Sequence, residues 1–328
     1  MMADHAGIGI ANGAGHQGVT VFFVLSGFLI TTLLIEERAL RGTVSLRRFY
    51  WRRGLRLLPA LVALLGVVAL ILGLAGRTRE IAGDVIPVVL YFMNWTTAAG
   101  NNPGLLSHTW SLSIEEQFYL VWPVVLLGLL AVGRGRLAWA AGLLVGAIVV
   151  AATLRVVLWV GPAAYYRVYV GTDTRMDSLA IGCLVAVVFA HRPIAVPPWA
   201  MAALAASIPI TLWLTNDESM ATFGLGLTAF AAAGLVAGAA TSVAEGVLAW
   251  RPLAYLGILS YGVYLWHRPL MRAFTDAGLG GVPWAVAVMF ALSIGLAFVS
   301  RRFIEDPFLA LKNRRFSSRG DASTLPNA

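Results

Sequence analysis

The chain has 328 residues, of which 59% are hydrophobic and 12% are charged. Soluble domains carry about 25% charged residues, so the composition excludes an ordinary soluble protein and predicts an integral membrane protein. The excess of 24 Lys and Arg over 16 Asp and Glu would suggest nucleic acid in a soluble protein. In a membrane protein the positive-inside rule accounts for it, so we expect no nucleic acid partner. The single cysteine, Cys183, excludes a disulfide within the chain and a thiolate metal cluster, and we expect no metal.

Nine apolar stretches predict an all-α polytopic protein with about nine transmembrane helices, although several are shorter than the ~20 residues of a straight crossing. They lie at residues 19–35, 57–75, 117–132, 137–160, 178–190, 198–215, 222–240, 252–267 and 284–300. A further apolar piece, residues 85–98, is short and broken by Asn94, and we expect it to be re-entrant or interfacial. Glycines four residues apart, such as Gly142 and Gly146, predict close approach of helices.

The basic residues predict the orientation of these spans. An arginine run follows the first span and consists of Arg38, Arg41, Arg47, Arg48, Arg52, Arg53 and Arg56. Placing this run inside also places most basic loop residues inside, with the N-terminus outside and the C-terminus inside. We expect residues 1–316 to form one membrane domain and residues 317–328 to be a disordered tail.

Four histidines lie toward the predicted outer surface, namely His5, His16, His108 and His267, and two of them are functional candidates. His5 precedes a glycine-rich stretch before the first span, and imidazole titrates near working pH, so His5 is a candidate general base. A surface histidine in a flexible tail is the alternative. His267 ends another span, one turn after Tyr264, and its alternative is an interfacial histidine without a role.

The stretch from His108 to Pro123 is the most informative polar patch. Glu115 and Glu116 lie at the mouth of a membrane span, where carboxylates are costly, so both are functional candidates. Solvated first-turn glutamates favoured by the helix dipole are the alternative. In a helix, Glu115 shares one face with three aromatic residues, Phe118, Tyr119 and Trp122. An interfacial aromatic belt would explain these rings but not the glutamates.

Arginines at two other places allow two interpretations each. Arg52, Arg53 and Arg56 precede the second span, either as positive-inside anchors or as a site for the phosphates of a cytosolic cofactor. Asp173, Arg175 and Asp177 open a later span, either as a local salt-bridged cap or as a polar cluster that faces the substrate.

Five motifs occur along the chain in one order. They are Phe22–Ile30 (FFVLSGFLI), Arg53-x-x-Arg56 before Pro59, Trp110–Tyr119 (WSLSIEEQFY), Arg175-Met-Asp177 with Gly182, and Ser260–His267 (SYGVYLWH). With these motifs, over nearly its whole length, the chain resembles the membrane-bound acyltransferase-3 family, which O-acylates sugars of surface polysaccharides, glycolipids and some secondary metabolites.

The resemblance implies a core of ten membrane helices with a catalytic histidine near the outer end of the first, a place that His5 occupies. It also implies an arginine about three helical turns before that histidine, and only four residues precede His5. We therefore expect that this chain lacks the family's first helix, because its start codon is assigned too late or because it is truncated. Thr20 stands where many members have Asp.

The resemblance further implies a multi-pass O-acyltransferase of a bacterial inner membrane. It would move an acyl group, with acetyl expected, from acetyl-CoA or another acyl-CoA to a sugar hydroxyl of a cell-surface glycan, a glycolipid or a secondary metabolite. We expect His5 to be general base or acyl carrier, and Glu115, in preference to Glu116, to orient it. The remaining candidates are His267 for catalysis, Arg52, Arg53 and Arg56 for the coenzyme phosphates, and Arg175, Asp177, Tyr264 and Trp110 for the acceptor.

Two alternatives to the enzyme stay open. One is a membrane transporter of a glycan or small polar substrate, which would move its substrate without an acyl donor. Transporters often show internal repeats, and the sequence shows none, which favours the enzyme. The other is an inactive scaffold, which would tolerate His5→Ala and Glu115→Ala.

Overall fold

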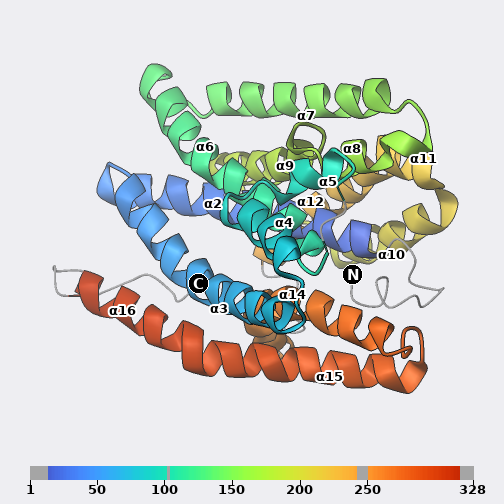
Figure 1. The fold of residues 1–328 in the computed structure, drawn as a ribbon. Coiled ribbons are helices and arrows are strands. Elements are labelled where there is room, and N and C mark those ends of the chain that lie inside the picture. The colour runs from blue at the N-terminus through green and yellow to red at the C-terminus, as the bar shows by residue number, and fades with distance from the viewer. Residues whose placement is uncertain (1–13, 102–103, 242–249, 318–328) are drawn as a thin grey trace. The chain divides into compact units, whose positions relative to one another are not determined.

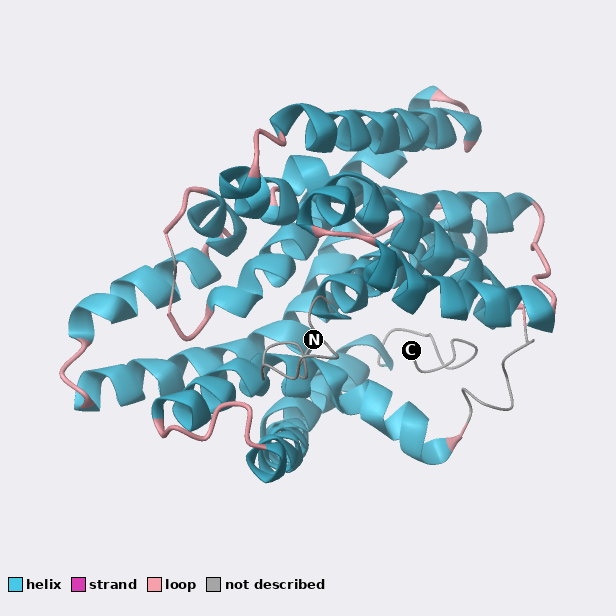
Figure 2. Ribbon diagram, turned by 90° about the vertical axis from the view of Figure 1, so that its right-hand side faces the viewer, coloured by secondary structure: helices cyan, strands magenta, loops and turns pink. Residues whose placement is uncertain are grey.

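The computed structural model describes residues 14–101, 104–241 and 250–317. These residues form helices joined by loops and contain no strand (Figures 1 and 2). Within them, seven helical segments are long and apolar enough to cross a membrane, at 15–41, 46–74, 107–132, 138–158, 172–191, 217–240 and 283–311. The predicted all-α polytopic membrane fold is therefore confirmed, whereas the number of crossings stays a prediction.

Each predicted span coincides with a helix. In chain order these helices are α2 (Ala14–Arg41), α3 (Leu46–Leu74), α6 (Trp110–Val132), α7 (Ala138–Leu158), α9 (Thr172–His191), α10 (Pro198–Leu214), α12 (Leu225–Ala240), α14 (Arg251–Asp276) and α15 (Pro283–Ser300). Shorter elements between and after them are η2 (Ser107–Thr109), η3 (Pro162–Ala164), α8 (Tyr165–Val170), α11 (Asp217–Ser219), η4 (Met220–Gly224), η5 (Arg301–Glu305) and α16 (Asp306–Ser317). Helix α10 has only 17 residues, and α14 is not among the seven apolar segments.

The predicted re-entrant piece forms two short helices, α4 (Thr78–Val89) and α5 (Met93–Ala98). The chain turns between them at Tyr91, which has φ 51°. Asn94 is fully buried in α5 and donates hydrogen bonds to Thr172 Oγ1 at 2.9 Å and Val170 O at 3.2 Å. This asparagine therefore ties α5 to the segment that leads into α9, and the depth of the piece in the membrane stays a prediction.

The chain divides into two compact units. The first unit comprises residues 1–44 and 82–253, and the second comprises residues 45–81 and 254–328. The first unit contains α2 and the helices from α5 to α12, and the second contains α3, most of α14, and α15 to α16. The prediction of one domain over residues 1–316 is not tested by this division. The predicted tail lies, apart from Ser317, outside the described residues.

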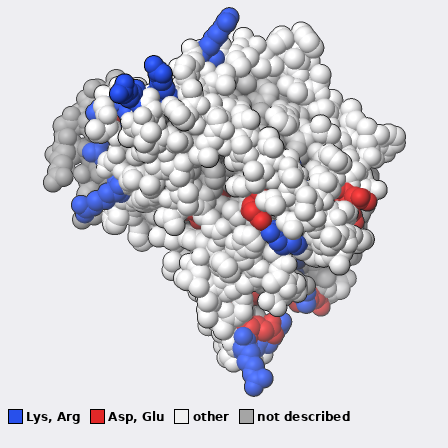
Figure 3. Space-filling model, turned by 90° about the horizontal axis from the view of Figure 1, so that it is seen from above, with Lys and Arg blue, Asp and Glu red and all other residues white. Residues whose placement is uncertain are grey.

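Helices α2, α9 and α12 form the centre of the first unit, with α7 against α9 and α10 against α12 (Figure 1). Their shared core consists of Val24, Phe28, Ile181, Ala186, Ala229, Ala232, Ala233 and Val236. Large apolar side chains such as Val149, Leu227 and Phe230 are more than half exposed on the outside. On the face in Figure 3, charged side chains form a few small groups and the remaining surface is uncharged. This distribution suits a protein surrounded by lipid.

Two glycines allow α2 and α9 to pack closely. A Cβ on Gly27 of α2 would collide with the carbonyl oxygen of Leu179, and a Cβ on Gly182 of α9 would collide with that of Val24. The prediction for Gly142 and Gly146 was wrong, because a Cβ at either position would meet nothing within 4 Å. Those two glycines lie on an exposed face of α7.

In the second unit, α15, η5 and α16 follow one another without a break, and α3 packs against η5 and α16. The Tyr261 hydroxyl of α14 donates to Leu57 O of α3 at 3.1 Å. Arg301 forms ion pairs with Glu305 at 3.3 Å and Asp306 at 2.9 Å near the end of α15.

Candidate active site

Glu115 is a buried carboxylate at the contact between α6 and α2. Its side chain is 5% exposed, and Oε1 accepts a hydrogen bond from Ser26 Oγ. The Tyr119 hydroxyl also hydrogen-bonds to Ser26 Oγ, and one turn later Trp122 Nε1 donates to Thr31 Oγ1 at 2.9 Å. Three of the four residues predicted to share a face of α6, namely Glu115, Tyr119 and Trp122, thus lie against α2. The seryl hydroxyl holds the carboxylate in place within the apolar interior.

Glu116 lies beside this face, with a half-buried side chain. The next residue, Gln117, belongs to a separate polar network. Its Nε2 donates to Tyr91 O at 2.7 Å and to Asn94 Oδ1 at 3.0 Å, and its Oε1 accepts from Thr172 Oγ1 at 2.5 Å. This network joins α5, α6 and the start of α9, and so fixes the position of α6 relative to α5 and α9.

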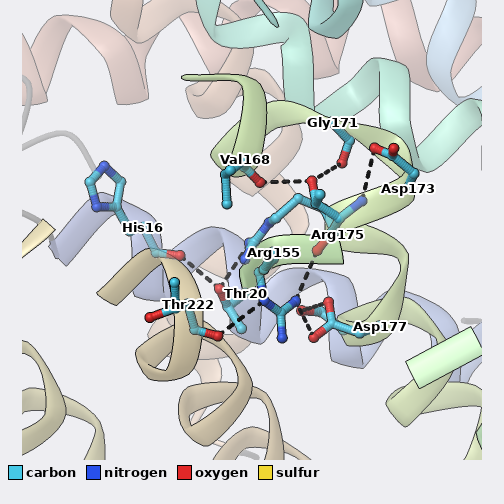
Figure 4. Close-up of polar contacts among 11 residues, drawn as sticks. His16, Thr20, Arg155, Val168, Gly171, Asp173, Arg175, Asp177 and Thr222 are labelled. Atoms are coloured by element: carbon cyan, nitrogen blue, oxygen red, sulfur yellow. Dashed lines mark hydrogen bonds and ion pairs between the residues drawn. The ribbon is translucent and has the colours of Figure 1, made fainter. Parts of the chain in front are cut away.

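A buried ion pair joins α7 to α9. Arg155 Nη1 lies 2.6 Å from Asp177 Oδ2, and the two side chains are 3% and 1% exposed. Nη1 also donates to Thr174 O at 2.8 Å, and Nε donates to Thr222 O at 3.4 Å (Figure 4). Sequence analysis did not assign a role to Arg155, and the only signal was a lone arginine inside an apolar span. Asp177, predicted to face the acceptor, is engaged by this arginine.

Arg175 is fully buried at the start of α9 and does not pair with Asp177. Its Nη2 donates to Thr20 Oγ1 of α2 at 2.9 Å, and Thr20 Oγ1 in turn donates to His16 O at 2.9 Å (Figure 4). The salt-bridged cap considered for this segment does not involve Arg175. Asp173 instead pairs with Arg167, which precedes α9, at 2.6 Å. The side chains of that pair are 31% and 32% exposed.

Aromatic rings gather around Arg175 at the start of α2. Tyr169 lies 4.4 Å from His16 and 4.9 Å from Trp110, measured between ring centroids, and stacks on Tyr165 at 5.6 Å. The Tyr165 hydroxyl lies 3.0 Å from Nε2 of His16. Burial raises the pKa of Tyr165 well above its usual value, because the phenolate would lose its hydration. Trp110, predicted on the acceptor side, is therefore part of an aromatic cluster with His16, Tyr165 and Tyr169.

The other candidates lie in the second unit. His267 is buried, and its Nδ1 lies 2.6 Å from Tyr264 O. A carbonyl only accepts hydrogen bonds, so Nδ1 carries the hydrogen and Nε2 is the basic nitrogen of the neutral ring. Arg52 and Arg53 are half-buried and Arg56 is exposed, in the first turns of α3. Residues 52 and 56 are four apart, so they share a helix face, and guanidinium groups in this arrangement fit phosphate.

The predicted site residues are distributed over the two units. Glu115, Trp110, Arg175 and Asp177 lie in the first unit, and Tyr264, His267 and the three arginines lie in the second. His5 lies outside the described residues. Sequence analysis missed the roles of Ser26, Thr20, His16 and Arg155. Ser26 lies in the first motif and Thr20 departs from the family's Asp, and both could have been signals, whereas His16 and Arg155 were single residues in or beside apolar spans. The described residues contain no group of His, Cys, Asp and Glu side chains able to hold a metal ion.

A buried carboxylate, buried arginines and an aromatic cluster among apolar helices define a polytopic membrane protein with polar groups inside its helical bundle, which is where functional sites of such proteins lie. A family model described as an acyltransferase domain matches residues 2–302. The chain therefore belongs to the acyltransferase-3 family.

Relatives with assigned names match over most of this chain. OatA of Listeria monocytogenes, named a peptidoglycan O-acetyltransferase, is 32% identical over 333 residues, which cover 94% of this chain and 53% of OatA. YrhL of Bacillus subtilis is 34% identical over 343 residues, which cover 96% of this chain and 54% of YrhL. The chain spans about half the length of the curated relatives it matches. No solved structure matches this chain.

Proposed function

We propose that this chain is a membrane O-acyltransferase that moves an acetyl group from acetyl-CoA to a hydroxyl of a cell-surface glycan, at the inner membrane of a bacterium. The acyltransferase domain over residues 2–302 and the names of the relatives support the reaction class. The observation that carries the proposal is the buried Glu115 carboxylate on an apolar helix long enough to cross a membrane, where it accepts a hydrogen bond from Ser26, whose hydroxyl also bonds to Tyr119. A carboxylate in that environment is costly and is kept for function.

In this reaction the C–S bond of the thioester breaks and an ester C–O bond forms with the acceptor oxygen. The acceptor hydroxyl loses a proton to a general base, and the departing thiolate takes a proton to become the free thiol. We assign the base, or the acyl carrier, to His5, with His267 as the second candidate. Glu115 orients this histidine and stabilises its protonated form. Glu116, the next residue, is the second carboxylate candidate for that role.

The donor and the acceptor use different side chains. Arg52, Arg53 and Arg56 hold the phosphates of the donor, because three guanidinium groups on the first turns of one helix match that charge. Arg175 and Trp110, both of the first unit, contact the acceptor, and Tyr264 is a separate candidate for that role. Asp177 acts indirectly, since its carboxylate is bound to Arg155 and keeps α7 against α9.

The test follows labelled acetyl from acetyl-CoA into the glycan and glycolipid fraction of membranes that contain the protein. We expect transfer by the wild type and at least a ~100-fold loss with His5→Ala or Glu115→Gln, the size typical of an acid–base residue. Glu218→Gln is the matched control, because Glu218 is an exposed acidic residue. Movement of a labelled glycan across the membrane without any acyl donor would instead favour a transporter. Equal acetyl transfer by the wild type, His5→Ala and Glu115→Gln would contradict the catalytic roles proposed for His5 and Glu115.

A further inference from the structure

We propose that Arg175 binds a carboxylate of the acceptor, so that this protein selects an acidic glycan. The inference rests on the proposed function, because it names the class of acceptor for that reaction. Its physical basis is a buried positive charge that the described residues do not neutralise.

Arg175 is 0% exposed and is among the largest fully buried side chains of the described chain. A guanidinium keeps its charge in proteins and offers five N–H groups as donors. Taking such a charge out of water is costly unless an anion and hydrogen-bond acceptors replace the water.

Among the described residues, the groups that contact Arg175 are all neutral. Nη2 donates to Thr20 Oγ1, and Cζ lies 5.6 Å from the ring centroid of Phe23 and 5.4 Å from that of Tyr169. Cation–π contact with two rings offsets part of the lost hydration. Nε and Nη1 have no hydrogen-bond acceptor among the described residues. These two nitrogens can still donate to a ligand.

The neighbouring acidic groups are engaged elsewhere. Asp177 pairs with Arg155 at 2.6 Å, and Asp173 pairs with Arg167 at 2.6 Å. Among the described residues, the start of α9 therefore holds one positive charge beyond its ion pairs. A carboxylate carries one negative charge and accepts charge-assisted hydrogen bonds from a guanidinium, so it matches this excess.

The position of Arg175 favours the acceptor over the acyl donor. Its partner Thr20 lies near the start of α2, and Arg38 and Arg41 lie in the last turn of that helix. At 1.5 Å per residue, 18 residues separate Thr20 from Arg38 by about 27 Å. In the predicted orientation the arginine run is inside, so Arg175 faces the outer side, where a glycan arrives. The rings of Trp110, Tyr165 and Tyr169 lie at the same end and offer flat faces against which a sugar can stack.

The decisive variant is Thr20→Asp, which places a carboxylate of the protein beside Arg175. This carboxylate would occupy the guanidinium and compete with the carboxylate of an acceptor. Thr20→Asn is the matched control, because asparagine has the size of aspartate without the charge. Arg175→Gln removes the charge itself.

The experiment compares one acidic oligosaccharide, as the free acid, with the same oligosaccharide after methyl esterification. Transfer of labelled acetyl is measured in membranes, and thermal unfolding of the purified protein is measured with each compound. We expect the wild type and Thr20→Asn to prefer the free acid by about 10-fold or more, as a charge-assisted hydrogen bond allows. Thr20→Asp and Arg175→Gln should lose this preference and still use the ester. Only the free acid should raise the unfolding temperature of the wild type.

Several outcomes would overturn the proposal. Equal use and equal binding of acid and ester by the wild type would make Arg175 a structural cation. The same conclusion follows if Thr20→Asp stabilises the protein but leaves the acid preference unchanged, or if Thr20→Asn loses the preference as fully as Thr20→Asp. If no form transfers acetyl, yet the free acid stabilises the wild type and not Thr20→Asp, the site stands and the proposed function falls.

Discussion

Arg155 of α7 and Arg175 of α9 are both buried, but the groups around their guanidinium groups differ. Around Arg155, a carboxylate and two carbonyl oxygens accept the N–H groups. Around Arg175, one hydroxyl and two aromatic faces stand in for an anion. Among the described residues, the Arg155 guanidinium has an anionic partner, whereas the Arg175 guanidinium has none and keeps two N–H groups without an acceptor. Hydrogen-bond saturation, rather than burial, therefore separates a charge that holds the bundle together from a charge kept for binding.

Asp177→Asn should give the largest effect, because it removes the anionic partner of Arg155. An uncompensated buried charge costs about 3–5 kcal/mol, so we expect a strong loss of folded protein. Size-exclusion chromatography of detergent extracts and thermal unfolding measure this loss. Asp173→Asn is the control, since the side chains of its ion pair are about one-third exposed and such pairs contribute about 1 kcal/mol or less. Normal folding of Asp177→Asn would show that Arg155 finds another partner.

Glu115→Gln tests whether the carboxylate at the contact between α2 and α6 stabilises the fold or takes part in acetyl transfer. Glutamine can still accept the hydrogen bond from Ser26, so we expect nearly normal stability. Loss of the charge should reduce acetyl transfer by about 100-fold, or about 2.7 kcal/mol. Measuring transfer and thermal unfolding on the same preparation separates the two. If the variant unfolds at a lower temperature but transfers acetyl at the normal rate per folded molecule, the role of Glu115 is structural, like that of Asp177.

Gly182→Ala tests the close contact that holds Arg175 of α9 against Thr20 of α2. The added Cβ would collide with the carbonyl oxygen of Val24, so the helices must separate. Overpacking of this kind costs about 1–3 kcal/mol. Gly146→Ala on α7 is the matched control: its Cβ meets open space, and alanine is the better helix former by about 1 kcal/mol. If both variants unfold at the same temperature, α2 and α9 pack less closely in the membrane than in this structure.

The sequence was sufficient for the helices and for one face of the site. Long apolar stretches have few alternatives to helix in a membrane, and helical periodicity placed Glu115, Tyr119 and Trp122 on one face because that relation is local. Whether Gly142 or Gly182 packs against a neighbouring helix depends on the facing helix, which local sequence does not identify. The same holds for Asp177, whose partner lies on α7.

Motif resemblance predicted which residues matter better than how they act. It placed Arg175 and Asp177 together as candidates for the acceptor site. The structure gives them separate partners, because residues two apart on a helix point in different directions. The neutral partner Thr20 and the paired Arg155 are visible only when α2, α7 and α9 are assembled.

The smallest effect concerns Tyr165, in the aromatic cluster beside Arg175. Burial raises the pKa of its hydroxyl, whereas an unfolded chain loses this proton near pH 10. The folded state therefore holds the proton more tightly, so the stability from this group is complete below about pH 10 and is lost only as the pH rises through the folded-state pKa. Tyr165→Phe should cost about 0.5–1.5 kcal/mol, the value of the hydrogen bond to His16. We expect this cost to be constant between about pH 7 and about pH 9.

Chemical denaturation of the wild type and Tyr165→Phe at several pH values measures this cost, with Tyr166→Phe as a control on an exposed neighbour. The tyrosinate absorbance of the wild type minus that of Tyr165→Phe should show no titration near pH 10. A titration there would mean that water reaches Tyr165 and, with it, the rings around Arg175. In that case the unsatisfied N–H groups of Arg175 would be hydrated, and the contrast with Arg155 would reflect solvent access rather than a charge kept for a ligand.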